Sequence, residues 1–219
     1  MNILIRTSQE RGHVEFDWLK SAHSFSFGEY YDPSNMGFGM LRVLNDDEIA
    51  GGGGFPPHSH RNMEIFTIPL AGSLSHQDST GTSSTITPGT IQIMSAGTGV
   101  THSEFNSSDV ETLKLLQIWI APHTTNLPPR YDEKHFSFLE DTNKLHTVIT
   151  PDGKDGTLVI YQDTYVSLGS FTKDGTFIYN IQKKGNGVYL FIIKGTVTVE
   201  SYTLDARDAA MIQETELLT

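Results

Sequence analysis

The sequence has no cysteine, so its 219 residues form no disulfide and any bound metal must be held by nitrogen or oxygen ligands. This absence excludes zinc ribbons and iron–sulfur clusters. Long apolar runs are also missing. Residues 1–7 contain only three consecutive apolar residues before an arginine, too few for a signal peptide, and no later run approaches the roughly 18 residues of a membrane span. We therefore expect a cytoplasmic protein with no membrane partner.

Basic residues are scarce. Fifteen Lys and Arg stand against 26 Asp and Glu, which gives a formal net charge of −11. Such a charge repels a phosphate backbone unless a local basic patch opposes it, and the densest basic stretch is the pair Lys183 and Lys184. A single lysine pair is more typical of a solvated turn, so we expect no direct binding of nucleic acid.

Long helical periodicity is absent, whereas 20 glycines and many turn residues separate short β-branched or aromatic runs. This pattern predicts an all-β sandwich or barrel rather than alternating strands and helices. With 37% hydrophobic residues the chain has enough apolar side chains for a buried core. The segments that favour strands are residues 38–44, 64–70, 90–95, 113–120, 158–161, 177–181 and 188–193.

The composition changes after residue 120. Residues 121–141 are rich in proline, histidine and charge, and they favour a short helix around residues 131–136. This segment is the best candidate for a domain boundary. We expect an N-terminal metal-binding barrel over residues 1–121 and a C-terminal barrel without metal ligands over residues 122–219.

A weak internal repeat supports two domains, because residues 68–75 resemble residues 191–198. The two halves are chemically unequal, since no histidine follows residue 146. Only the first half can therefore hold a metal through imidazoles.

Two pairs of potential ligands share one spacing. His58 and His60 follow a run of glycines at positions i and i+2, and His102 and Glu104 repeat that spacing after a second glycine-rich turn. Side chains two residues apart leave an extended strand on the same face. A lone His-x-His pair is more often a surface feature, but two pairs brought together in a barrel supply three neutral nitrogens and one carboxylate. Such a set suits a borderline divalent metal such as Fe(II), Mn, Ni, Cu or Zn.

The sequence resembles known family motifs at these positions. His58-x-His60-x-x-x-Glu64 followed by Gly72 resembles the first cupin motif, and Gly99-x-x-His102-x-x-x-Asn106 resembles the second. A denser resemblance to the pirin family runs over residues 6–131. Its motifs are Arg11-Gly12-His13, Trp18-Leu19, His23-Ser24-Phe25-Ser26-Phe27-Gly28, Tyr31-Asp32-Pro33, Asn35-Met36-Gly37-Phe38-Gly39, His58-x-His60-Arg61-x-Met63-Glu64, Gly99-Val100-x-His102-Ser103-Glu104 and Leu116-Gln117-Ile118-Trp119-Ile120. The chain departs from the family at Thr80 and Thr82, which we expect to affect a loop rather than the ligands.

This resemblance implies an all-β bicupin fold of two jelly-roll-like barrels with little helix. It also implies one divalent metal ion in the N-terminal barrel, for which we expect Fe(II), with Mn, Ni, Cu, Zn or Co as alternatives. The implied ligands are His58, His60, His102 and Glu104. Ordinary cupins take their carboxylate ligand from the first motif, which makes Glu64 the competitor of Glu104. The pirin pattern assigns Glu104, and Glu64 is then expected to orient an imidazole from outside the ligand set.

Two functions compete. Pirin-like proteins are associated with quercetin 2,3-dioxygenase activity, which implies a quercetin-like flavonol and O₂ as substrates and Glu104 as the catalytic base that takes the flavonol 3-hydroxyl proton. The alternative is a non-enzymatic metal-binding protein that acts through protein–protein contacts as a regulator or redox sensor. We favour the enzyme. The remaining histidines are interpreted as structural: His13, His23, His76, His123, His135 and His146.

Overall fold

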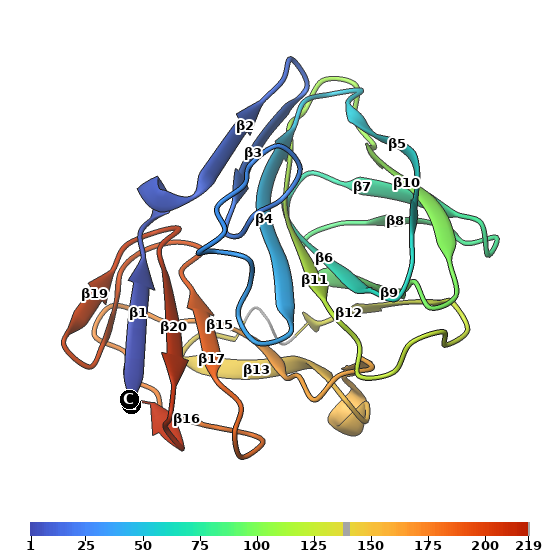
Figure 1. Cartoon of the computed structure of the whole chain (residues 1–219). Coiled ribbons are helices and arrows are strands. Elements are labelled where there is room, and N and C mark those ends of the chain that lie inside the picture. Colours follow the sequence, from blue (N-terminus) through green and yellow to red (C-terminus); the bar gives the residue numbers. More distant parts are fainter. Residues whose placement is uncertain (138–140, 219) are drawn as a thin grey trace. The chain divides into compact units, whose positions relative to one another are not determined.

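The computed structural model describes residues 1–137 and 141–218, which consist almost wholly of β-strands joined by turns (Figure 1). In these ranges the helices are two three-residue 3₁₀ turns, η1 (Ser8–Glu10) and η3 (Lys154–Gly156). None of the described helices is long and apolar enough to cross a membrane. The expected all-β class with little helix is confirmed.

The chain forms two compact units, each assembled from segments that are far apart in the sequence. Unit 1 comprises Met1–Arg11, Glu140–His146 and Leu168–Thr219, and unit 2 comprises Gly12–Leu139 and Thr147–Ser167. All the candidate ligands belong to unit 2. The expected division of the chain between residues 121 and 122 stays a prediction.

Unit 2 contains two antiparallel sheets. The larger has seven strands in the order β12-β9-β6-β11-β4-β3-β2, and the smaller has four in the order β5-β10-β7-β8. The strands of the larger sheet are β2 (Gly12–Glu15), β3 (Leu19–His23), β4 (Leu41–Ile49), β6 (Glu64–Ala71), β9 (Thr90–Ser95), β11 (Leu113–Ile120) and β12 (Arg130–His135). Those of the smaller sheet are β5 (Gly54–His60), β7 (Leu74–Asp78), β8 (Ser83–Ile86) and β10 (Val100–Asn106).

The central strands of the larger sheet were visible in the sequence as apolar runs. The strands expected over residues 90–95 and 113–120 coincide with β9 and β11, and the one expected over 64–70 falls within β6. These strands have neighbours on both sides and bury residues on both faces, so their sequences read as nearly continuous hydrophobic stretches. The strand expected over residues 38–44 begins only at Leu41, because the chain turns through a β-bridge between Phe38 and Leu41.

The short helix expected around residues 131–136 is wrong. The segment forms β12 and pairs antiparallel with β9, with Tyr131 opposite Met94 and His135 opposite Thr90. The physical reason is that β9 would otherwise be the edge of the sheet, and its free backbone groups take up this segment as a further strand. Local composition does not reveal this pairing, because it depends on a strand 40 residues earlier in the chain.

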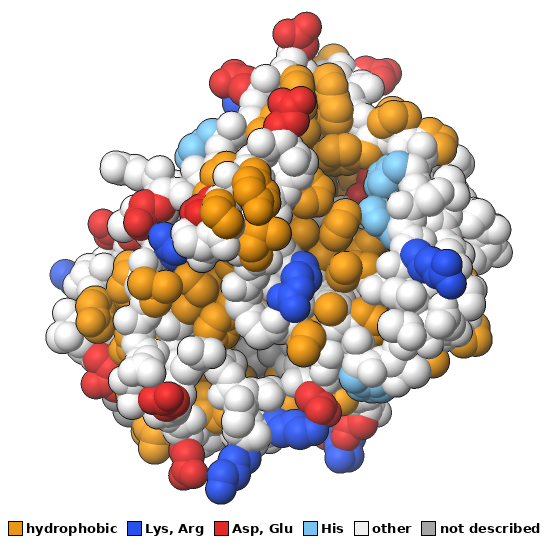
Figure 2. Space-filling model, viewed as in Figure 1, with side chains coloured by type: hydrophobic (Ala, Val, Ile, Leu, Met, Phe, Trp, Pro, Cys, Tyr) orange, Lys and Arg blue, Asp and Glu red, His pale blue; other side chains and the backbone are white. Residues whose placement is uncertain are grey.

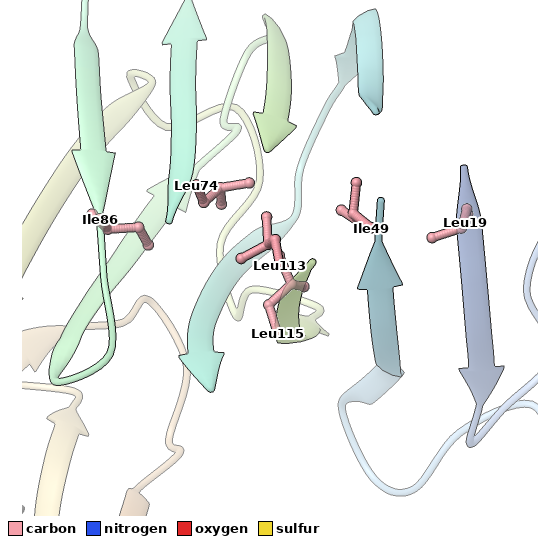
Figure 3. Packing of buried hydrophobic residues seen from close by; sticks show 6 residues of the cluster. All are labelled: Leu19, Ile49, Leu74, Ile86, Leu113 and Leu115. Carbon is pink, nitrogen blue, oxygen red and sulfur yellow. The ribbon is translucent and has the colours of Figure 1, made fainter. Parts of the chain in front are cut away.

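An apolar cluster joins the two sheets of unit 2 (Figure 3). It is contributed by β3, β4 and β11 of the larger sheet and by β7 and β8 of the smaller one. Its members are Leu19, Ile49, Leu74, Ile86, Leu113 and Leu115, and all are at most 6% exposed. This cluster holds the smaller sheet against the larger one, and so fixes β10 and β7 opposite β6, β9 and β11.

Unit 1 consists of short strands around its own apolar cluster. Its sheets have the orders β1-β20-β17, β16-β21 and β18-β19. The strands are β1 (Asn2–Arg6), β16 (Tyr179–Asn180), β17 (Val188–Phe191), β18 (Val197–Val199), β19 (Tyr202–Leu204), β20 (Ala209–Gln213) and β21 (Leu217–Leu218). The strands expected over residues 177–181 and 188–193 fall on β16 and β17, which are shorter.

A further sheet contains β13 (Lys144–Thr150), β14 (Leu158–Val159) and β15 (Val166–Ser170).

The apolar cluster gives a direct test of the fold. Leu113→Ala removes a side chain that is 0% exposed, and we expect unfolding to become easier by about 2–5 kcal/mol because a cavity remains. Val110→Ala, three residues away, is the matched control, since Val110 is 88% exposed and its truncation should change stability by less than about 0.5 kcal/mol. Urea unfolding followed by circular dichroism measures both variants. Equal unfolding midpoints for the two would show that the cluster does not hold the sheets together.

Candidate metal centre

The candidate ligands lie on two neighbouring strands of the smaller sheet. β5 and β10 pair antiparallel, with His102 directly opposite His58. β10 alternates between buried and more exposed residues, so His102 and Glu104 share its buried face. The turn before β10 includes Gly97, whose φ of +47° and contact with the Leu127 carbonyl oxygen leave no room for a side chain. The expected i, i+2 geometry is therefore present on β10.

The structure brings three imidazoles together. The ring centroids of His58 and His102 are 4.5 Å apart, and His60 lies 4.8 Å from His58 and 4.9 Å from His102. One ring nitrogen from each of the three lies within 4.8 Å of the others. Three nitrogens at this spacing can converge on one ion after small side-chain adjustments.

The hydrogen bonding of these rings fits a metal ion. His58 Nδ1 lies 2.8 Å from the Pro56 carbonyl oxygen, and a proton donated there leaves the Nε2 lone pair available. His60 Nε2 and both ring nitrogens of His102 are buried and have no hydrogen-bond partner among the described residues. Buried polar atoms in proteins are nearly always paired, so nitrogens left without partners beside one another indicate a ligand that the protein chain itself does not supply.

Two of these rings, those of His60 and His102, are also held in the neutral form that a metal requires. Burial lowers the pKa of His60 to about 4, and the nearby charge of His58 adds to this effect. Burial likewise lowers the pKa of His102 to about 3, with further contributions from His58 and His60. Both rings are therefore uncharged at neutral pH and offer a lone pair for coordination.

Glu104 is a buried carboxylate held by two amides. The side chain is 2% exposed; Gln117 Nε2 donates to its Oε2 over 2.6 Å, and Gln92 Nε2 donates to its Oε1 over 2.7 Å. The hydroxyl of Thr67 donates in turn to the Gln117 amide oxygen over 2.9 Å. Burial raises the pKa of Glu104 to about 7, although the hydrogen bonds from Gln117 and Gln92 act in the opposite direction.

Glu104 lies close to His102, which is one of the three converging histidines. Its carboxylate lies in a second group of potential ligand atoms, with His102 and His76, that are all within 4.8 Å of one another. Among the described residues, the group of His58, His60 and His102 does not include it at that spacing. His102 is therefore common to both groups.

Glu64, the competing carboxylate, lies in different surroundings. Its Oε2 accepts hydrogen bonds from the Ser95 hydroxyl over 2.8 Å and from the Tyr161 backbone N–H over 3.2 Å. Burial raises the pKa of Glu64, and these two hydrogen bonds oppose the shift. Within the described part of the chain, Glu64 belongs to no group of potential metal ligands.

His76, which we expected from the sequence to be structural, lies in a group of potential ligands with His102 and Glu104. It lies on β7 directly opposite Glu104, is 1% exposed, and its ring centroid is 5.3 Å from that of His102. The signal in the sequence is the spacing of His76 and Asp78, which repeats the i, i+2 pattern of the other two pairs. The other histidines expected to be structural, His13, His23, His123, His135 and His146, fall in no metal-binding group among residues 1–137 and 141–218.

Aromatic side chains pack beside His60. The Trp119 ring packs edge-on against His60 with centroids 4.7 Å apart, and Phe27 packs edge-on against Trp119 at 5.2 Å. Figure 2 shows histidine side chains reaching the surface beside hydrophobic ones. A flat aromatic molecule fits such a wall, because apolar faces with a few polar groups are typical of small-molecule sites.

Removing the shared imidazole tests this geometry. We expect the affinity of His102→Ala for divalent transition metals to fall by more than roughly 100-fold. Loss of a residue that only hydrogen-bonds to a metal ligand costs roughly 10- to 100-fold in affinity. The variant should stay folded, because the apolar cluster of unit 2 does not involve His102. Metal content after dialysis and circular dichroism measure the two effects, with His135→Ala, an exposed histidine outside both groups, as the control. Unchanged metal content in His102→Ala would contradict the site.

Comparisons with known proteins agree with this geometry. The Pirin family model matches residues 4–120, and the model described as the quercetinase C-terminal cupin domain matches residues 147–219. Quercetin 2,3-dioxygenase of Escherichia coli K12 is 40% identical over 217 residues, covering 99% of this chain and 92% of that protein. A pirin-like protein of Caulobacter vibrioides is 41% identical over 210 residues, with coverages of 95% and 89%.

A solved structure supports the same relationship. The bacterial pirin YhhW from Escherichia coli, in complex with nickel(II), superposes with a TM-score of 0.93 at 40% identity, covering 99% of this chain and 92% of that one. The two cupin models and the all-β architecture confirm the bicupin fold. The extent of the match and the convergence of its histidines show that the chain belongs to the pirin family.

Proposed function

We propose that this chain is a metal-dependent dioxygenase that cleaves the heterocyclic ring of quercetin-like flavonols with O₂. The observation that carries the proposal is the set of three converging imidazoles, two of them with buried nitrogens that have no hydrogen-bond partner among the described residues, beside a buried carboxylate. Relatives named quercetin 2,3-dioxygenase, at 40% identity over nearly the whole chain, support the reaction class.

The residues that would hold the metal are His58, His60, His102 and Glu104. Three imidazoles and one carboxylate suit a first-row divalent ion, for which we propose Fe(II). The nickel(II) complex of YhhW supports a site of this chemistry in a relative. When bound, such an ion acts as a Lewis acid that lowers the pKa of a flavonol hydroxyl and favours reaction with O₂.

All four proposed ligands precede residue 121. We therefore assign metal binding and chemistry to the N-terminal domain, residues 1–121, and no ligand to residues 122–219. The separate family models for residues 4–120 and 147–219 support this division.

Glu104 is the proposed catalytic base. It supplies the one negative charge in an otherwise neutral ligand set, and its carboxylate oxygens are the acceptors for the 3-hydroxyl proton of the flavonol. The amide donors of Gln92 and Gln117 fix the orientation of these oxygens and leave one lone pair on each oxygen for a further partner. The edge-packed rings of Trp119 and Phe27 bind the flat substrate and exclude water from the face that they cover.

Glu104→Gln separates the two roles of this residue. The amide retains an oxygen that can remain near the ion, but it cannot take the substrate proton. We expect the variant to keep part of its metal and to lose about 10²- to 10⁴-fold in turnover per bound metal, the usual contribution of a positioned base. The measurement is the loss of flavonol absorbance under air, for wild type and variant at matched metal occupancy.

Glu64→Gln is the matched control, because it makes the same change at the other buried glutamate among the described residues of unit 2. We expect it to retain both metal and turnover per metal more fully than Glu104→Gln. Equal turnover per metal in Glu104→Gln and wild type would leave Glu104 as a ligand only. Loss of metal in Glu64→Gln, with none in Glu104→Gln, would transfer the ligand role to Glu64.

A further inference from the structure

His76 has the hydrogen-bonding arrangement of a metal ligand. Metal-binding histidines usually donate one ring N–H to an oxygen acceptor and present the other nitrogen to the ion. His58 shows this arrangement, with its Nδ1 at 2.8 Å from the Pro56 carbonyl oxygen. His76 shows it in a buried setting, because its Nε2 lies 3.1 Å from Asp78 Oδ2. The other nitrogen, Nδ1, is buried and has no hydrogen-bond partner among the described residues.

The carboxylate that holds His76 is itself fixed. Asp78 Oδ1 accepts hydrogen bonds from the backbone N–H of Thr80 over 2.8 Å, from the Thr80 hydroxyl over 2.6 Å and from the backbone N–H of Thr82 over 3.2 Å. Three donors to one oxygen keep this group as an acceptor, so His76 donates through Nε2 and its Nδ1 carries the lone pair. The loop in which the chain departs from its family therefore fixes the carboxylate that His76 contacts.

The free nitrogen of His76 has suitable neighbours. β7 pairs with β10 so that His76 lies opposite Glu104 and Asp78 lies opposite His102. His76, His102 and Glu104 each offer a ligand atom within 4.8 Å of the other two, and all three residues are at most 3% exposed. His102 has both ring nitrogens without partners among the described residues, so its single lone pair can lie on either nitrogen and serve one position or the other. The ring of Tyr131 packs against that of His76, and the two ring centroids are 4.7 Å apart.

We propose that His76, His102 and Glu104 form an inner metal position, which binds a divalent ion without His58 and His60. Two imidazole nitrogens and one carboxylate make a three-ligand set that leaves coordination positions open. The position under Proposed function, called the outer position, has His58 and His60 with His102 and Glu104. The two positions share His102 and Glu104, so the inner position replaces His58 and His60 by His76 as the further ligand.

The test removes the outer position and asks whether metal binding survives. In His58→Ala/His60→Ala we expect one equivalent of Co(II) to bind, measured by equilibrium dialysis and metal analysis, with folding checked by circular dichroism. Adding His76→Gln, which keeps an amide donor for Asp78 but removes the imidazole, should weaken Co(II) binding at least about 100-fold. Asp78→Asn in the same background should weaken it by about 10- to 100-fold, the usual effect of an outer-shell partner.

His135→Gln in the same background is the control and should change nothing, because His135 is exposed and outside both groups. A folded His58→Ala/His60→Ala variant that binds no Co(II) would overturn the proposal, as would equal affinity with and without His76→Gln.

If the variants do not fold, crystals of the wild type grown in excess Co(II) provide the test. Anomalous density next to His76 Nδ1 supports the inner position, and density confined to the outer histidines contradicts it. Neither result depends on flavonol turnover.

Discussion

The burial of the Glu104 carboxylate is the constraint on which the rest of the site depends. An unpaired charge at this depth would be costly, and the two amides of Gln92 and Gln117 offset that cost by donating to both oxygens. These amides belong to a row of cross-strand partners, in which Gln117 lies opposite Asn45 and Thr67, and Thr67 lies opposite Gln92. A slip of one residue in β9 or β11 would turn Gln92 or Gln117 to the other face and remove one of the two amide donors to Glu104.

The apolar cluster and the polar row of unit 2 therefore have separate structural roles. The cluster around Leu113 and Leu74 holds the two sheets together, and this frees the polar row of the larger sheet to face β10 of the smaller one. The polar row orients the carboxylate, while the smaller sheet supplies the imidazoles. Under our proposal, a metal ion in this setting would meet imidazole nitrogens and one carboxylate that the sheet registers hold close together.

The sequence was sufficient for features that depend on local pattern. The buried runs of β9 and β11, the all-β class and the shared face of His102 and Glu104 follow from spacing and hydrophobicity. Features that depend on strand pairing were not accessible. The segment that forms β12 resembles a helix until β9 is known to be beside it, and His76 appears isolated until β7 pairs with β10 and places it opposite Glu104. The amide donors to Glu104 are likewise 12 and 13 residues away in sequence and are brought near it only by the sheets.

The central claim is that a metal ion bound at these histidines enables the chain to oxidise flavonols. The most direct measurement is oxygen uptake with quercetin, together with detection of carbon monoxide, for protein stripped of metal and for the same preparation reloaded with Fe(II) under anaerobic conditions before air is admitted. We expect oxygen to be consumed and carbon monoxide to be released only by the reloaded protein, in proportion to its bound metal. Equal oxygen uptake by both preparations, or none by a fully reloaded one, would contradict it.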